Sequence, residues 1–457
     1  MTDQQRPHGI TRRQFAASAT TAATVFNIVP RHVLGGAGHQ APSERVDLAA
    51  IGAGGQGGGD INQMASHGAN VVALVDVDQV RAAATIKRFP KARVYRDFRR
   101  MFDKEAKHID GVTVGTPDHV HAVASMAAMR RGKHVFCEKP LTHTIFEARQ
   151  LTLAAAQYGV ATQMGNQGHA TEGARLTNEW IRAGVIGDVD EVHVWTDRAG
   201  KYWKQGIGRP VARPPIPATL DWDLWLGPVR SRPYHPVYCP KMWRGWWDFG
   251  TGAMGDMGCH IVDHPIWALE LGSPAAVEAV CTHDGLEING KPNFETYPIA
   301  ATIYYEFPAR GKRPAVKMTW YEGGLMPPTP AEMPTGQSLP GNGVLYVGSK
   351  GKLYHGSHGG MPQLLPGDLL DAAKAVKKTM PRSPGHYLEW LQACGGKGTA
   401  VSNFSYSGPM TETVLLGVLA QRAPGRRLEW DGPNMKVRNV PELNQFVHKS
   451  YRKGWTL

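Results

Sequence analysis

Two side chains that could move a proton stand four residues apart in the stretch GAMGDMGCHIVDH. If the residues from about Ala253 form a helix, Asp256 and His260 are neighbours on one face, ~6 Å apart between Cβ atoms. A carboxylate at that distance can orient an imidazole and raise its basicity, as a general base requires. The same spacing fits a helix-capping aspartate beside a buried structural histidine. Asp263 and His264 are weaker candidates nearby.

A lysine that could stabilise negative charge lies in the stretch CEKPLTHT, directly after an apolar strand. Glu138 and Lys139 precede Pro140, and such a bond is cis in ~5% of cases without special strain. A cis bond would turn the lysine into the crevice at the end of the strand. The alternative is a plain strand-to-helix turn with a solvated Lys–Glu pair.

A glycine-rich turn supplies the third chemical signal. Gly52, Gly54 and Gly57 form G-x-G-x-x-G between an apolar strand and a helix, the context that the motif requires. These glycines allow a tight turn, close approach of a pyrophosphate, and close packing of helix on strand. Asp76 ends the second strand, where its carboxylate can bind an adenosine ribose and would repel a 2′-phosphate. The pattern predicts NAD in preference to NADP, and a loop without a ligand is the alternative.

The next strands end in further candidate cofactor contacts. VTVGTPDHVHAVA closes the fourth strand, and the C-terminal ends of parallel strands line the ligand crevice. We therefore expect Thr116, Pro117, His119 and His121 near the cofactor, although His121 could equally be structural. Gln56, Glu138, Lys139 and Gln167 complete the predicted cofactor contacts.

Two kinds of sheet are needed to position these residues. From Val46 to about residue 165, short apolar runs alternate with helical patterns, which predicts βαβ units and a doubly wound parallel sheet. Beyond that point the runs DVDEVHVWTD, AAVEAVC, IAATIYYEF, RPAVKMTWYE, GVLYVG and GKLYHG predict a large, mostly antiparallel sheet with one open face. The expected fold class is α/β, with domains over residues 43–165 and 166–457.

Composition excludes several classes of protein. The 51 basic and 39 acidic residues give +12, and the first 38 residues carry +3 of it (four Arg less one Asp), leaving +9. This charge favours anionic surfaces or substrates, but the basic residues are scattered without a recognition motif, so we expect no nucleic-acid partner. The five cysteines lie far apart with no CxxC pair, which predicts neither a metal site nor a disulfide framework.

The first 38 residues have the pattern of an export signal. Twin arginines in TRRQF precede a weakly apolar stretch from Ala16 to Val29, which falls short of the ~20 residues that span a bilayer. The pattern resembles a twin-arginine signal peptide, which is read by a translocase for folded proteins. We expect a periplasmic or otherwise exported protein that is not an integral membrane protein. An ordinary disordered N-terminus is the alternative.

The motifs AAIGAGGQG, TPDHVH, CEKPLT, GNQGH and GAMGDMGCHIVD occur in this order. Together they resemble the Gfo/Idh/MocA family of oxidoreductases, named after glucose–fructose oxidoreductase, inositol dehydrogenase and rhizopine catabolism. LDWDLWLGP and WRGWWDFGTGAMGDMGCH resemble its exported twin-arginine subgroup. The resemblance covers nearly all of residues 46–457. It implies an NAD-binding Rossmann domain, then a substrate-binding and oligomerisation α/β domain, with the nicotinamide at their junction.

The resemblance also implies an enzyme and assigns roles to its residues. Lys139 matches the family's EKP lysine, and Asp256 and His260 match its aspartate–histidine pair. By analogy His260 takes a hydroxyl proton while a hydride leaves to the nicotinamide, Lys139 stabilises the alkoxide, and Asp256 orients His260. Alcohol oxidation needs a base, a positive group near oxygen and an adjacent hydride acceptor. Exposed sheet faces often pair subunits in this family, so a homodimer or homotetramer is expected.

The expected substrate is a carbohydrate. Residues 209–247 hold eight prolines and five tryptophans, which predicts a long ordered loop whose indole faces could pack on a sugar ring. Most of these tryptophans should be core, with one or two at the ligand. Predicted substrate contacts are Asn166, Arg175, Trp243, Arg244 and His260.

Two enzymatic functions stay open from the sequence. The first is an oxidoreductase acting on a secondary sugar hydroxyl, with C3 as the candidate position, and with tightly and non-covalently bound NAD. The second is an NAD-dependent glycoside hydrolase that oxidises transiently, eliminates the aglycone, adds water and reduces again. A non-catalytic sugar-binding relative would lack the lysine or the histidine, and both are present.

Overall fold

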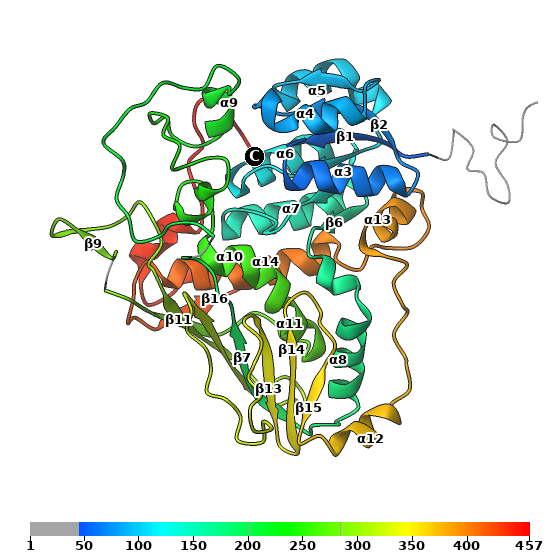
Figure 1. Cartoon of the computed structure of the whole chain (residues 1–457), viewed down its shortest axis with the longest axis vertical. Coiled ribbons are helices and arrows are strands. Elements are labelled where there is room, and N and C mark those ends of the chain that lie inside the picture. The colour runs from blue at the N-terminus through cyan, green and yellow to red at the C-terminus, as the bar shows by residue number, and fades with distance from the viewer. Residues whose placement is uncertain (1–44, 201, 284) are drawn as a thin grey trace, which may run out of the picture. The chain divides into compact units, whose positions relative to one another are not determined.

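Two β-sheets and the helices between them organise the chain (Figure 1). The computed structural model describes residues 45–457 except 201 and 284, so the predicted leader, residues 1–38, lies outside the described residues. Val46–Leu457 form one compact unit. No helix within the described part of the chain is both long and apolar enough to cross a bilayer.

The first sheet is parallel throughout, with strand order β3-β2-β1-β4-β5-β6. Its strands are β1 (Asp47–Ile51), β2 (Asn70–Val75), β3 (Arg93–Tyr95), β4 (Gly111–Val114), β5 (His134–Cys137) and β6 (Thr162–Met164). Its helices are α3 (Gln56–Ser66), α4 (Gln79–Arg88), α5 (Phe98–Glu105), α6 (Asp118–Met129) and α7 (Ile145–Tyr158). The chain direction across the sheet reverses between β1 and β4, which creates a ligand crevice beyond their C-terminal ends.

The local sequence explains these elements. The strands are short apolar runs, and β4 is buried at every position, as expected where helices cover both faces of a parallel sheet. Asp78 caps α4 by accepting hydrogen bonds from the N–H groups of Val80 and Arg81. Thr144 and Glu147 form a capping box at the start of α7. Helices α4 and α7 therefore begin directly after a capping side chain.

The second sheet has nine strands in the order β15-β14-β13-β7-β12-β11-β8-β16-β17. They are β7 (Val189–Trp195), β8 (Ala276–Cys281), β11 (Ala301–Phe307), β12 (Val316–Glu322), β13 (Gly343–Gly348), β14 (Gly351–Gly356), β15 (Gln363–Leu365), β16 (Leu428–Asp431) and β17 (Lys436–Val437). Pairing is antiparallel except between β12 and β7. Burial alternates along β11, so one face of the sheet packs on helices and the other is open. The predicted α/β fold class is confirmed.

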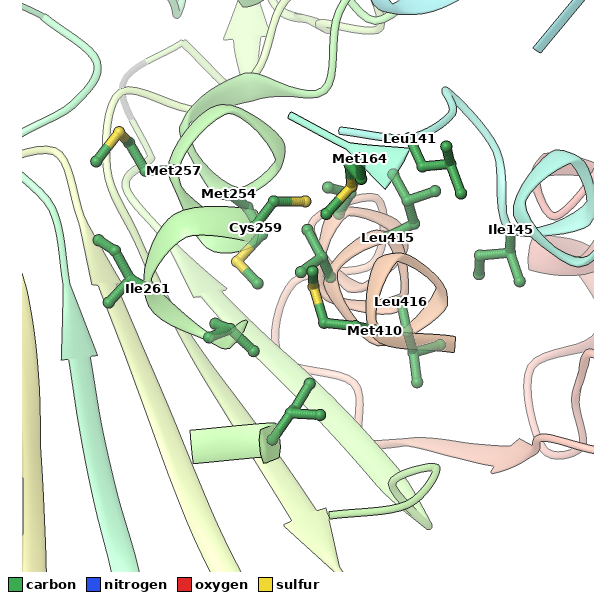
Figure 2. Close-up of a cluster of buried hydrophobic side chains, with 14 of the residues drawn as sticks. Leu141, Ile145, Met164, Met254, Met257, Cys259, Ile261, Met410, Leu415 and Leu416 are labelled. Carbon is green, nitrogen blue, oxygen red and sulfur yellow. The ribbon is translucent and has the colours of Figure 1, made fainter. Parts of the chain in front are cut away.

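The remaining helices connect the two sheets. They are η3 (Gln167–Ala170), α8 (Glu172–Arg182), α9 (Trp222–Leu226), η4 (Met242–Gly245), α10 (Gly252–Ile261), α11 (Asp263–Ala268), α12 (Leu369–Lys374), α13 (His386–Cys394), α14 (Phe404–Ala420) and η5 (Pro441–Phe446). A small hairpin, β9 (Glu287–Ile288) and β10 (Lys291–Pro292), stands apart. Helix α14 contacts α7, β6 and α10. Figure 2 shows the buried side chains that join them, including Met164, Met254, Met410 and Leu415. This core fixes α10, which carries Asp256 and His260, against the first sheet.

Candidate active site

The glycine turn between β1 and α3 is shaped by close backbone contacts. Gly52 has φ +87°, and a Cβ there would lie 2.7 Å from the carbonyl carbon of Gly115. A Cβ on Gly57 would lie 2.0 Å from the oxygen of Gly52, so α3 packs as closely as the motif predicts. The N–H of Gly54 donates to the carboxylate of Asp76 at 2.7 Å. The turn and the end of β2 are thereby held together.

A cavity of about 380 Å³ opens at this turn. Predicted cofactor residues that line it are Gly52, Gly54, Gln56, Asp76, Thr116, Pro117, Glu138 and Lys139. The hydroxyl oxygen of Thr116 is buried here without a hydrogen-bond partner in the described structure. A cradle of glycines and an unused polar atom fit a dinucleotide whose phosphates sit at the start of α3. No group of three or more metal-ligating side chains is arranged for an ion within the described residues.

Lys139 meets Asp256 at the edge of this cavity. The peptide bond between Lys139 and Pro140 is cis. Lys139 Nζ donates to an Asp256 carboxylate oxygen at 2.9 Å and to the Asp256 backbone oxygen at 3.0 Å. Arg244 Nε donates to the same carboxylate oxygen at 3.0 Å. Burial alone would raise the pKa of Asp256, but the two cations hold it well below its usual range. Asp256 is therefore an anion between two positive groups.

His260 lies one helical turn from Asp256 on α10 and is buried. No hydrogen bond joins the two side chains among the residues that the structure describes, and His260 Nδ1 has no partner. Burial and the charge of Lys139 lower the pKa of His260 well below its usual value, while Asp256 opposes the shift. A neutral imidazole can accept a proton. Asp256 thus acts on His260 through its charge rather than through a direct bond.

His358, which the sequence analysis missed, stacks on His260 with ring centroids 4.0 Å apart. It follows β14 on a glycine-rich loop and has φ +58°. A Cβ on Gly168 would lie 2.5 Å from the His358 carbonyl carbon, so this glycine lets the loop reach the site. The run HGSHGG was the available signal, because glycines on both sides of a histidine permit such a close approach.

Buried acids stand behind the glycine turn. Burial raises the pKa of Glu138 to about 8 and that of Asp60 to about 6. Gln56 donates to Asp60 at 3.0 Å, and Gln167 donates to Glu138 at 3.4 Å. Gln56 lines the cavity, whereas Gln167 reaches it only through Glu138. Asp118, another residue missed from the sequence, also lines the cavity, and burial raises its pKa to about 7.

Two histidines predicted near the cofactor are structural. The ring nitrogens of His121 lie 2.7 Å from the Thr116 oxygen and 2.8 Å from the Pro140 oxygen. His119 is likewise held by the backbone oxygens of Trp225 and Phe249. Both imidazoles are fully buried and neither lines the cavity. His121, which was predicted to bind cofactor, thus lies behind the cavity with backbone oxygens within hydrogen-bond distance of both its nitrogens.

Two predicted substrate contacts are also structural. Asn166 is fully buried, where it donates to Asp263 at 3.1 Å and accepts from Ser402 at 2.5 Å. Arg175 is buried and donates to the backbone oxygens of His169 and Pro381. Asp263, Ser402 and Pro381 come from segments distant in sequence, whereas His169 lies only six residues before Arg175. Neither side chain faces the cavity.

Trp243 and Arg244, which were predicted to contact substrate, line the same cavity as Lys139. The Arg244 guanidinium stacks 4.2 Å from the Trp243 ring centroid. Trp225 also lines the cavity, whereas Trp246 and Trp247 are buried elsewhere. Most tryptophans of this segment are core, and they form a cluster of their own.

Two family models match the chain. Residues 46–166 match the Gfo/Idh/MocA oxidoreductase family model for the NAD-binding Rossmann fold. Residues 174–286 match the model for the C-terminal α/β domain of the same family. Together the two matches cover just over half of the 457 residues.

Curated relatives align with parts of the chain. It is 26% identical over 208 residues to levoglucosan dehydrogenase of Pseudarthrobacter phenanthrenivorans, covering 45% of this chain and 44% of that protein. It is 32% identical over 100 residues to 2,7-anhydro-N-acetylneuraminate hydratase of Escherichia coli, covering 22% of this chain and 26% of that protein. The alignments thus span less than half the length of either relative.

A solved structure extends the likeness to the whole fold. The WlbA dehydrogenase from Bordetella pertussis, in complex with NADH and UDP-GlcNAcA, superimposes with a TM-score of 0.59 at 17% identity. The alignment covers 85% of this chain and 98% of that one. The two family models, the glycine turn and this fold agree. The chain belongs to the Gfo/Idh/MocA family of oxidoreductases.

Proposed function

We propose that the chain is an exported enzyme that moves a hydride between a secondary hydroxyl of a sugar or glycoside and resident NAD. The observation that carries this proposal is the meeting of Lys139, Asp256 and Arg244 at the mouth of the glycine-lined cavity, with His260 one turn along α10. These groups come from both parts of the chain and meet beside the crevice in which Rossmann-type sheets bind dinucleotides.

The chain's own residues would divide the work as follows. When bound, the oxidised nicotinamide accepts a hydride from the carbon that carries the hydroxyl. His260 takes the hydroxyl proton, because burial keeps its imidazole neutral. The ammonium of Lys139 stabilises the negative charge that develops on oxygen. Asp256 holds Lys139 in place through two hydrogen bonds.

A carbohydrate substrate is supported by the walls of the site and by the relatives. Trp243 lines the cavity beneath the Arg244 guanidinium, and Arg244 keeps donors beyond the one that binds Asp256. The names of the relatives include an anhydrosugar dehydrogenase, and the solved neighbour carries a sugar nucleotide. We propose a pyranose or glycoside, oxidised at C3.

A second function deserves a test because one relative is named as a hydratase. A glycoside hydrolase that oxidises, eliminates, adds water and reduces again would use the same lysine and histidine. An aryl glycoside that releases its phenol with no net redox change supports the hydrolase. Accumulation of a keto sugar supports the dehydrogenase.

Export would require that the cofactor stay bound. With association near 10⁶ M⁻¹s⁻¹ and residence of hours, the dissociation constant must reach ~0.1 nM, roughly 13 to 14 kcal/mol. A ligand of about 44 heavy atoms at ~0.3 kcal/mol per atom can supply this. We propose that the twin-arginine translocase moves the folded, loaded enzyme to the periplasm, and that it assembles as a homodimer or homotetramer.

The experiment is to express the full chain and purify it from the periplasm without added NAD. Absorbance at 260 and 340 nm after denaturation should reveal one dinucleotide per chain. An exported preparation that is empty would refute the resident cofactor. Substitution of both Arg12 and Arg13 by Lys should keep the protein in the cytoplasm, whereas Arg6→Lys serves as the matched control.

A further inference from the structure

One wall of the dinucleotide cavity comes from outside the first sheet. At one end the cavity is lined by Val77 and Asp78 after β2 and by Arg96 and Phe98 after β3. In this type of sheet the adenosine half of a dinucleotide lies at the end of β2. The side chains facing these residues are Leu220, Leu224, Tyr234, Cys239 and Trp455. They follow β2 in sequence by more than 140 residues.

The first part of this wall is the cover segment, defined here as residues 217–240. Its backbone pairs with the chain just after β2, because Asp221 N–H donates to the Val77 oxygen at 2.9 Å. An antiparallel bridge joins Leu220 to Asp78 beside this bond. The cover segment also has an apolar core of its own, with Trp222 and Trp225 stacked 4.7 Å apart. The cover segment is therefore a packed element of the fold and not a loop without contacts.

The second part is the C-terminal tail, defined here as residues 449–457. The Trp455 ring lies 5.9 Å from Phe98 and 4.2 Å from the Arg99 guanidinium. The tail is tied to the cover segment, since Arg452 N–H donates to the Pro228 oxygen at 2.8 Å and its Nε donates to the Gly227 oxygen at 3.1 Å. In Figure 1 the end of the chain lies beside α9 of the cover segment. Tail and cover segment form one continuous wall.

We propose that the cover segment and the tail bind the adenosine half of the dinucleotide and set its rate of release. The proposal rests on the proposed function, in which that dinucleotide is resident NAD. Two segments distant in sequence close one end of the cavity and are fastened to each other and to the ends of β2 and β3. The dinucleotide would leave only when this wall opens. The wall is thus the device by which a non-covalent cofactor is retained.

The test measures release from the full-length, cofactor-loaded protein. Trp455→Ala and Tyr234→Ala should each release bound NADH about tenfold faster than the wild type, because each substitution removes an aromatic side chain from the cavity wall. The loss of NADH fluorescence after addition of excess NAD gives the rate. ADP-ribose, which lacks the nicotinamide, should also be released faster from the two variants than from the wild type, by the same factor as NADH. A competition assay measures this release.

Tyr451→Phe is the matched control, because Tyr451 lies in the tail and does not line the cavity. This substitution removes only the hydrogen bond from the Tyr451 hydroxyl to Glu147. The variant should release NADH at the wild-type rate. If Trp455→Ala fails to fold, the release rates of Trp455→Leu and Tyr234→Ala are compared with that of the wild type instead. An unchanged rate of NADH release in both wall variants would refute the proposed role of the wall, as would faster release of NADH without faster release of ADP-ribose. Either result would leave the proposed function intact. A wild-type protein that binds neither compound would refute both.

Discussion

Lys139 holds Asp256 by two hydrogen bonds, one to its carboxylate at 2.9 Å and one to its backbone oxygen at 3.0 Å. The two residues are 117 positions apart, one following β5 and the other inside α10. This contact ties the C-terminal end of β5 to the helix that carries His260.

Asp256→Asn tests the ion pair. The amide leaves Lys139 and Arg244 without their counter-charge, so we expect the rate of cofactor reduction to fall about 100-fold. The loss of a negative charge that raises the pKa of His260 should also lower that pKa further. A stopped-flow pH profile at 340 nm measures both effects. Asp371→Asn, on an exposed side chain, is the control, and an unchanged rate in Asp256→Asn would contradict the role of the pair.

The pH profile of the wild type follows from the state of His260. Burial and Lys139 lower its pKa well below 6.5, so the neutral base is present at pH 7. As the pH falls through the lowered pKa, the imidazole becomes protonated and the rate should decline. The acid limb of the reduction rate is therefore expected below pH 6.5. A limb centred above that value would show that a different group is titrating.

Two glycines of α3 make a matched pair. Gly57→Ala should abolish NADH binding and destabilise the fold by about 1–3 kcal/mol, because its Cβ would lie 2.0 Å from the Gly52 oxygen. Gly59→Ala meets no atom within 4 Å and should stabilise the helix by about 0.5–1 kcal/mol. Fluorescence titration with NADH and urea unfolding compare them. Equal behaviour of the two variants would contradict the described packing.

Glu322→Gln probes a buried carboxyl of the second sheet. Burial raises the pKa of Glu322 from 4.5 to about 7, and Trp320 donates to it at 2.9 Å. Because the pKa of Glu322 is higher in the folded than in the unfolded protein, the free energy of unfolding falls as the pH rises from 4.5 through 7. Glutamine keeps an acceptor and does not ionise, so the variant should be more stable than the wild type at pH 8 by about 1–3 kcal/mol.

Urea unfolding at pH 5 and pH 8 makes this comparison. The gain should shrink at pH 5, where the wild-type carboxyl is protonated. Glu306→Gln, an exposed partner of Arg427, should show no such gain at pH 8. A Glu322→Gln protein that is less stable at both values would mean that the carboxyl is not buried as described.

Much of the fold could be predicted because its signals are local. Apolar runs that alternate with capped helices indicate the parallel sheet, and the spacing of Asp256 and His260 indicates their shared helix. The partner of Asp256 could not be predicted in this way. Local spacing favours His260, but the fold brings Lys139 and Arg244 to the carboxylate instead.

Some site residues have surroundings that differ from the expected ones, for the same reason. Asn166 follows β6, where a parallel strand ends at the crevice, yet Asp263 and Ser402 occupy its amide. His358 and Trp455 reach the site from segments far along the chain. The contacts of Asn166 and Trp455 depend on tertiary packing, which no short motif encodes, whereas the glycines around His358 are a local signal.

The most direct test of the account is reduction of the bound cofactor at 340 nm by a panel of sugars and glycosides. Wild-type protein should reduce its cofactor with at least one sugar, while Lys139→Met and His260→Ala should slow reduction by about 100-fold or more at unchanged cofactor content. Reduction by both variants at the wild-type rate would contradict the proposed chemistry.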